Sequence, residues 1–354
     1  AQCHHHPYEK WSEDDYYGLQ AFFSRITRKP GLQPGEETVL HNRGQATSKN
    51  PRTGKTLKPK PLGGEELTIP SYEDPREHLA DWMINPANPF FAKMLVNRYW
   101  KHFFGRGLVD PEDDLRVTNP ATHPELLKGL ASDFIANGYD LKRLIRTITN
   151  SHTYQLSAIP NQHNSEDSQN YSRFYPRRLP AEILLDGINT VTGANESFAG
   201  QPAGTRAIQL PDDTFSKSSY FLSVFGRPDM NSACECERSA DVNLAQALHL
   251  VNSNNIRLKL SSDQSRPANL AKQKDAQPQN LLTQLYLHAL SRPPQPAELA
   301  TALAYLQRKQ NEPGPTSPKE DNKTAPVDPI LPTRQAYEDL IWALLNTKEF
   351  LFNH

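Results

Sequence analysis

Two residues near the amino terminus, Cys3 and His4, are of the types that hold a c-type haem. In a Cys-x-x-Cys-His motif, both thiols bond covalently to the porphyrin and the adjacent histidine ligates the iron. This sequence carries Ala1-Gln2-Cys3-His4, so the other cysteine of such a motif would be the residue before Ala1. On spacing alone, Cys3-His4 is also an ordinary dipeptide. His5 and His6 follow directly, and because successive side chains diverge on a regular element, at most one or two of these histidines could ligate one metal.

A second pair of thiols lies in the segment Cys234-Glu235-Cys236-Glu237-Arg238. In an extended segment, side chains two residues apart point to the same side. Cys234 and Cys236 could therefore bind a soft metal, pair as a strained disulfide or remain thiols. The sequence offers no Cys-x-x-Cys partner for a zinc site, so a structural role is favoured over a redox or metal role.

A polar face is predicted on a helix over residues 88–104, where it carries Asn97, Arg98, Lys101 and His102. Four carboxylates follow within the short segment 110–114, and such a cluster could bind Ca²⁺. The spacing of an EF-hand loop is absent, however. A turn whose acids pair with the neighbouring Arg116 is the favoured interpretation.

Arginines flank Tyr175 at positions 173, 177 and 178, in a composition that would suit an anion clamp, although a solvated or ion-paired face is favoured. Buried polar groups cost free energy unless they bond to one another, so the polar residues of these segments could line one site. The candidate polar site consists of Asn97, Arg98, His102, Arg177, Arg178, Cys234, Cys236 and Arg238. The sequence contains no nucleophile elbow, P-loop, dinucleotide fingerprint or His-Glu-x-x-His motif.

The overall composition excludes several classes of protein. The 354 residues include 39 Lys and Arg against 40 Asp and Glu, which gives a net charge of −1. This balance excludes a chain-wide basic footprint, so nucleic acid is not expected as a partner. No run of about 18 apolar residues occurs, and no transmembrane helix is therefore expected in this chain. The 3 cysteines cannot support a disulfide-dense scaffold.

The periodicity of apolar residues predicts a mainly α fold, an irregular multi-helix domain with long proline-rich loops. A small β-hairpin excursion is expected near residues 36–60, where strand-like residues precede a turn. A flexible linker is predicted over 310–333 from its prolines, followed by a helix whose apolar stripe must dock on the preceding helices. Helices are expected over residues 9–28, 88–104, 123–135, 140–148, 180–192, 241–251, 280–290, 296–307 and 334–345.

Several long motifs resemble a planctomycete family of secreted proteins with a cytochrome-type domain and paired domains of unknown function. They are Asn88-Pro89-Phe90-Phe91-Ala92, Val96-Asn97-Arg98-Tyr99-Trp100, His123-Pro124-Glu125-Leu126-Leu127, Asn150-Ser151-His152-Thr153-Tyr154-Gln155, Arg173-Phe174-Tyr175-Pro176-Arg177-Arg178, Phe225-Gly226-Arg227-Pro228 and Cys234-Glu235-Cys236-Glu237-Arg238. The resemblance implies that residues 1–66 are the carboxyl-terminal end of a PSCyt-type cytochrome domain, truncated at its start. Residues 67–354 would be a PSD-type helical domain of unknown function.

The resemblance also implies haem c, held by Cys3 and with His4 as the proximal iron ligand. The second attachment cysteine would lie outside this chain, just before Ala1. The distal ligand stays open among Met83, Met94, Met230, His41 and His102. A c-type haem is assembled outside the cytoplasm, so a periplasmic or secreted location is expected. Oxidising conditions there would favour the disulfide alternative for the paired cysteines.

Three functions are compatible with these observations. The leading one is an extracytoplasmic, c-type-haem-associated electron-transfer protein with an unknown redox partner and an unassigned second domain. The first alternative is a non-catalytic helical scaffold or partner protein at the cell surface. The second alternative is an enzyme that acts on an extracellular polysaccharide, with the candidate polar site in the second domain.

Overall fold

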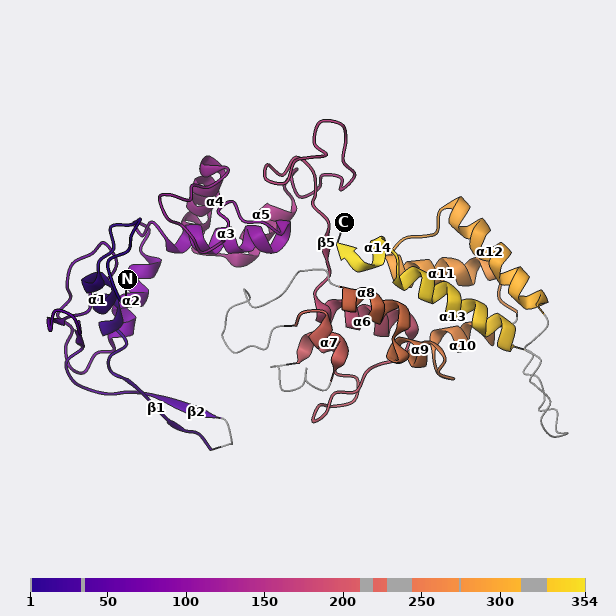
Figure 1. The fold of residues 1–354 in the computed structure, drawn as a ribbon, viewed down its shortest axis with the longest axis horizontal. Coiled ribbons are helices and arrows are strands. Elements are labelled where there is room, and N and C mark those ends of the chain that lie inside the picture. Colours follow the sequence, from indigo (N-terminus) through magenta and orange to yellow (C-terminus); the bar gives the residue numbers. More distant parts are fainter. Residues whose placement is uncertain are drawn as a thin grey trace. The chain divides into compact units, whose positions relative to one another are not determined.

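The computed structural model describes residues 2–32, 36–210, 219–227, 244–273, 275–312 and 330–353. The chain divides into two compact units, Ala1–Tyr175 and Pro176–His354 (Figure 1). Helices dominate the described residues, and the strands form only two-stranded antiparallel pairs. The predicted mainly α fold is therefore confirmed. The boundary predicted after residue 66 concerns family domains and stays a prediction.

The first helix of the amino-terminal unit, α1 (Glu13–Ala21), begins at a capping box. The backbone N–H of Asp15 donates to Ser12 Oγ at 3.2 Å, and the N–H of Ser12 donates to Asp15 Oδ2 at 2.9 Å. A serine followed three residues later by an acidic residue is a sequence that favours such a cap. The helix is shorter than the predicted span 9–28, because the chain leaves the helix after Ala21 and Ile26 begins a strand.

That strand, β1 (Ile26–Pro30), pairs antiparallel with β2 (Glu37–His41). A strand over 37–41 was expected, but its partner lies upstream of the predicted excursion and not within it. The helical prediction over 9–28 failed here because a short apolar stretch does not distinguish a helix end from a strand. Phe23, an apolar residue of this stretch, is 50% exposed. A second, shorter hairpin joins β3 (Ser48–Lys49) to β4 (Thr56–Leu57).

The β3–β4 hairpin is tied to α1 by charge. Lys55 Nζ lies 3.2 Å from a carboxylate oxygen of Asp14, and Lys60 Nζ lies 3.0 Å from Asp15. Both acids lie in the first turn of α1, where negative charge also complements the helix dipole. The β3–β4 hairpin is thus part of the packing around α1.

Four further helices complete this unit, and their bounds are α2 (Pro75–Ile84), α3 (Phe91–Phe104), α4 (Pro124–Ala136) and α5 (Leu141–Thr149). Helix α3 packs against α4 and α5 around a core that includes the buried residues Val96, Trp100 and Phe134. It ends at Gly105, whose φ of 80° is a conformation that glycine adopts without steric cost.

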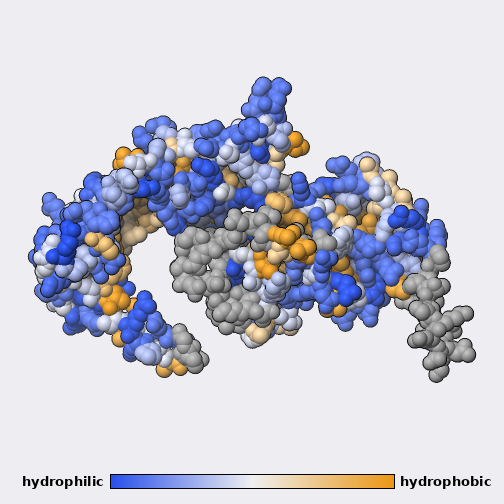
Figure 2. All heavy atoms as spheres, viewed as in Figure 1, coloured by the Kyte–Doolittle hydropathy of each residue, from blue (hydrophilic) through white to orange (hydrophobic). Residues whose placement is uncertain are grey.

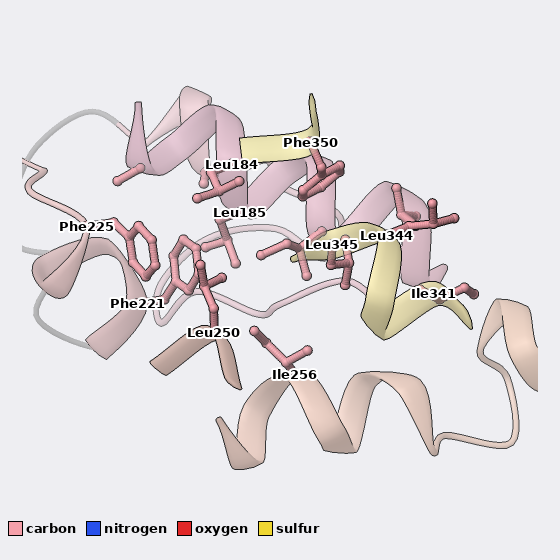
Figure 3. Close-up of a cluster of buried hydrophobic side chains, with 14 of the residues drawn as sticks. Leu184, Leu185, Phe221, Phe225, Leu250, Ile256, Ile341, Leu344, Leu345 and Phe350 are labelled. Carbon is pink, nitrogen blue, oxygen red and sulfur yellow. The ribbon is translucent and has the colours of Figure 1, made fainter. Parts of the chain in front are cut away.

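The carboxyl-terminal unit is built around α6 (Ala181–Thr192), which contributes Leu184 and Leu185 to a large apolar core (Figure 3). The other elements among the described residues of this unit are β5 (Arg177–Arg178), η1 (Ala207–Gln209), α7 (Tyr220–Val224), α8 (Leu244–Asn252), α9 (Asn254–Leu260), α10 (Arg266–Ala271), α11 (Pro278–Leu290), α12 (Pro296–Asn311), α13 (Leu331–Leu345), α14 (Lys348–Leu351) and β6 (Phe352–Asn353). Strand β6 pairs with β5, which joins the two ends of this unit's sequence.

Helix α13 packs against α10, α11 and α12, and it buries Tyr337, Ile341 and Leu345. Of the predicted linker over 310–333, the first two residues belong to α12 and the last three to α13, while 313–329 lie outside the described residues. Hydrophilic residues cover most of the described surface in the view of Figure 2. Within the described residues, no helix combines the length and apolar character needed to cross a bilayer.

Candidate functional site

The amino-terminal segment places Cys3 and His4 at the surface. Cys3 is an exposed free thiol, and the His4 side chain is also exposed. His4 Nδ1 lies 2.7 Å from the carbonyl oxygen of His5. Because a carbonyl oxygen can only accept a hydrogen bond, this contact requires the proton on Nδ1. In the neutral ring, the lone pair of His4 is then on Nε2, the atom through which a ligating histidine binds a metal when Nδ1 donates to a carbonyl.

The next two histidines have the opposite arrangement. His5 Nδ1 accepts from the backbone N–H of Glu13 at 3.3 Å, and His6 Nδ1 accepts from the N–H of Tyr8 at 3.3 Å. Their neutral rings therefore carry the proton on Nε2, and their lone pairs face the protein backbone. The sequence allowed one or two ligands among the three histidines, and hydrogen bonding now distinguishes His4 from the other two.

Among the described residues, no three His, Cys, Asp or Glu side chains converge to hold a metal on their own. A porphyrin brings most of the iron ligands itself, so the protein need supply only an axial nitrogen, for which His4 is suited, and a thiol for covalent attachment, for which Cys3 is suited. Of the residues considered for the distal position, His41 has a buried Nε2 without a hydrogen-bond partner in the described part of the chain. Met83 packs beside the core of Phe22, and Met230 lies outside the described residues.

The polar face of α3 holds the loop that follows the helix. Asn97 is fully buried, and its Nδ2 donates to the carbonyl oxygens of Val109 at 2.8 Å and Glu112 at 3.0 Å. The N–H of Val109 donates in return to Asn97 Oδ1 at 3.0 Å. The loop carbonyls that would otherwise be buried without partners are satisfied in this way.

The acidic residues of the same loop are paired with basic side chains. Arg98 contacts Asp113 through two hydrogen bonds of 2.8 and 2.5 Å, and Lys101 Nζ lies 2.5 Å from Glu112. The other pairs of this loop are Arg106 with Asp110 and Arg116 with Asp114. The Lys101 ammonium holds the pKa of Glu112 below its usual range, against the opposing effect of burial. His102 is exposed and its ring lies edge-on to Phe103.

The structure assigns the candidate polar residues to different units. Asn97, Arg98 and His102 belong to the amino-terminal unit, whereas Arg177 and Arg178 form β5 of the carboxyl-terminal unit. Arg178 Nη2 donates to the carbonyl oxygen of Phe225 at 3.1 Å, and its guanidinium lies 5.4 Å from the centre of that ring. The remaining candidates, Cys234, Cys236 and Arg238, lie outside the described residues.

A buried row of polar side chains on α6 was missed by the sequence analysis. Glu182, Asp186 and Asn189 are spaced by four and three residues and are each less than 10% exposed. Their partners come from other elements of the same unit: Arg227 Nε lies 3.5 Å from Glu182, the N–H of Ala207 donates to Asp186 at 2.7 Å, and Lys259 Nζ donates to Asn189 at 2.8 Å. The signal was present, because acids and amides at this spacing in an otherwise apolar helix share one face.

The polar side chains of α6 bond to residues of the surrounding segments and so hold these segments against the helix. Lys259 also lies 3.5 Å from Glu196, and burial lowers the pKa of its ammonium. Nearby on α8, the His249 ring packs edge-on against Phe221 and Phe225, and burial lowers the pKa of this imidazole. Each side chain of the row is satisfied by a specific donor, which is the pattern of a structural network.

Comparison with known proteins adds a family match. A family model described as "PSD1: Protein of unknown function (DUF1553)" matches residues 75–306. This span includes α3, the acidic loop that follows it, and the polar row of α6. No curated protein and no solved structure matches the chain.

Proposed function

Because the chain belongs to the PSD1 family (DUF1553), for which no activity is described, we propose a function from the geometry of its amino terminus: electron transfer by a c-type haem attached at Cys3, with His4 as the proximal iron ligand. The cytochrome-type segment over residues 1–66 and its pairing with the PSD1 domain are part of this proposal.

The observation that carries the proposal is the hydrogen bond from His4 Nδ1 to the His5 carbonyl, at 2.7 Å. It directs the Nε2 lone pair away from the backbone and toward solvent, where an iron ion could be bound. The same bond would orient the ring and raise its basicity as a ligand. The exposed Cys3 thiol is the adjacent residue and would form one thioether bond to a porphyrin vinyl group.

When bound, the haem supplies one-electron chemistry. Haem c attachment takes place outside the cytoplasm, so the proposal includes a periplasmic or secreted location. It also includes a redox partner, whose identity is unknown. The exposed position of Cys3 and His4 supports short-range contact with such a partner.

The test uses the full chain with one cysteine added before Ala1, produced in a host that matures c-type haem. We expect a Soret band and haem that stays with the polypeptide on a denaturing gel. His4→Ala should change the Soret and visible bands, because the proximal ligand is lost, while His5→Ala and His6→Ala should preserve them, because among these three histidines only His4 has its Nε2 lone pair available. A haem-free product, or equal spectra for all three histidine variants, would reject the proposal.

A further inference from the structure

A cavity of about 460 Å³ opens in the carboxyl-terminal unit between α13 and the corner where α8 meets α9. Its floor consists of the apolar side chains of Leu250, Ile256 and Leu260, all of which belong to buried parts of the unit. The other side chains that line it are polar or aromatic, and they come from α13 and from the α8–α9 corner. Pockets of this size with an apolar floor and a few convergent polar groups are typical of small-molecule binding sites.

One wall of the cavity is a single face of α13. Glu338, Asp339 and Trp342 line it, and because Trp342 follows the two acids by four and three residues, its side chain lies beside both of theirs on the helix. Trp342 is 39% exposed, so part of its indole ring is accessible. Such an exposed ring has an apolar, electron-rich face and an N–H donor at its edge.

The carboxylates on this wall are held in fixed positions. Arg334 Nε donates to Glu338 at 2.9 Å, and the Tyr305 hydroxyl donates to Asp339 Oδ2 at 2.5 Å. Each of these bonds engages one carboxylate oxygen, and a carboxylate has several acceptor positions. Both groups can therefore accept further hydrogen bonds from a ligand without being reoriented.

The opposite wall offers complementary donors. Asn252 is exposed at the end of α8, and Arg257 lies on α9, where its Nη2 bonds to Asn254 at 2.9 Å. Between them Ser253 caps α9 by accepting from the N–H of Ile256 at 3.4 Å, and its hydroxyl hydrogen can still donate. The cavity thus has acceptors on one side, donors on the other and an aromatic ring at its mouth.

We propose that this cavity binds a neutral sugar residue, such as a hexose of an oligosaccharide. A pyranose ring has an apolar C–H face that suits the Trp342 ring and a rim of hydroxyls that both donate and accept. The charges at the cavity favour neither an anion nor a cation: Glu338 pairs with Arg334, Asp339 lies 3.8 Å from Lys309, and Arg257 lies on the opposite wall. This binding site is independent of the haem proposal.

The test is isothermal titration calorimetry of the full chain with cellotriose, maltotriose and mannotriose. We expect saturable binding of at least one of these sugars. Trp342→Ala should weaken it by roughly tenfold, because the stacking surface is lost, while Trp342→Phe should retain most of the affinity. Asn252→Ala, on the opposite wall, should weaken binding as well. Leu258→Ala changes an exposed α9 residue that does not line the cavity, so it should leave binding unchanged.

Circular dichroism of each variant separates loss of binding from loss of fold, and only folded variants are compared. The absence of a binding heat with all three sugars would overturn the proposal. So would equal affinity of the wild-type chain and Trp342→Ala. Choline and inorganic phosphate serve as charged probes, and binding of either that depends on Trp342 would assign the cavity to a different ligand class.

Discussion

The side chain of Asn97 pairs with the backbone of one residue, Val109, in both directions. Asn97 Nδ2 donates to the Val109 carbonyl at 2.8 Å, and the Val109 N–H donates to Asn97 Oδ1 at 3.0 Å. The amide is completely buried, so water cannot replace either bond. Helix α3 thereby fixes the start of the acidic loop, and the ion pairs of that loop follow from this anchor.

Replacing Asn97 by alanine should destabilise the amino-terminal unit by about 2–4 kcal/mol, because buried backbone groups of Val109 would lose their partners. The measurement is urea unfolding followed by tryptophan fluorescence, to which the buried Trp100 contributes. Arg98→Ala is the matched control on the same helix. Its ion pair with Asp113 is partly exposed, so the loss should stay below about 1 kcal/mol. Equal losses in the two variants would contradict this assignment of roles.

Gly107 lies next to the same anchor and leaves no room for a side chain. A Cβ atom there would lie 2.2 Å from the Val109 carbonyl oxygen and 3.0 Å from Asn97 Nδ2. Gly107→Ala should therefore destabilise the unit by at least about 2 kcal/mol through steric overlap with backbone. Gly129→Ala provides the opposite case, since nothing lies within 4 Å of its Cβ position on α4. That variant should gain about 0.5–1 kcal/mol in the same unfolding experiment.

Local capping chemistry made several helix boundaries predictable. Gly105, Asp140 and Gly193 lie at or next to the ends of the predicted spans 88–104, 140–148 and 180–192, and the structure has helix ends at all three positions. The strand over Ile26–Pro30 was not predictable in this way. Its hydrogen-bond partners come from Glu37–His41. Whether the segment forms a strand therefore depends on a second segment and not on its own apolar pattern alone.

The candidate sites were likewise predictable only where the contacts involved are local in the sequence. Composition alone singled out Asn97 as polar on an apolar helix, but its partner is the backbone of a residue twelve positions away. The difference among His4, His5 and His6 depends on backbone atoms that approach each ring. The cavity beside Trp342 combines α13 with the α8–α9 corner, about ninety residues earlier in the chain, and no spacing in the sequence indicates that meeting.

Arg292 links two glutamates and should make the carboxyl-terminal unit sensitive to acid. It bonds to Glu298 at 2.8 and 2.9 Å and to Glu349 at 2.6 and 2.7 Å. The guanidinium lowers the pKa of Glu298 to about 2. This pKa is below the unfolded value of about 4.3. The stabilisation is therefore fully present above about pH 4.3 and is lost as the pH falls from there toward 2.

Arg292→Lys should lower the stability of this unit by about 1–2 kcal/mol near neutral pH, because an ammonium cannot bind two carboxylates in the same bidentate geometry. Its unfolding midpoint in urea should also vary less than that of the wild type between about pH 5 and about pH 2. Arg308→Lys changes a far more exposed arginine on α12 and should leave the acid dependence intact. If the stability of Arg292→Lys depends on pH as strongly as that of the wild type, Arg292 is not the source of the acid sensitivity.

Tyr171 predicts the opposite pH dependence for the amino-terminal unit. Its hydroxyl donates to the Gly107 carbonyl at 2.8 Å, and the ring packs edge-on against Trp100. Burial raises the pKa of this phenol to about 12. The folded chain therefore keeps the proton to higher pH than the unfolded chain, and stability should fall as the pH rises from about 10 to about 12.

Tyr171→Phe should cost about 1–2 kcal/mol near neutral pH, since the Gly107 carbonyl would lose its donor. It should also remove part of the alkaline loss, because the group that titrates differently in the two states is gone. The comparison is urea unfolding of both chains near neutral pH and at alkaline pH, with Tyr8→Phe as the control at a phenol that is 67% exposed. If Tyr171→Phe and wild type lose stability in parallel as the pH rises, the buried phenol is not the group responsible.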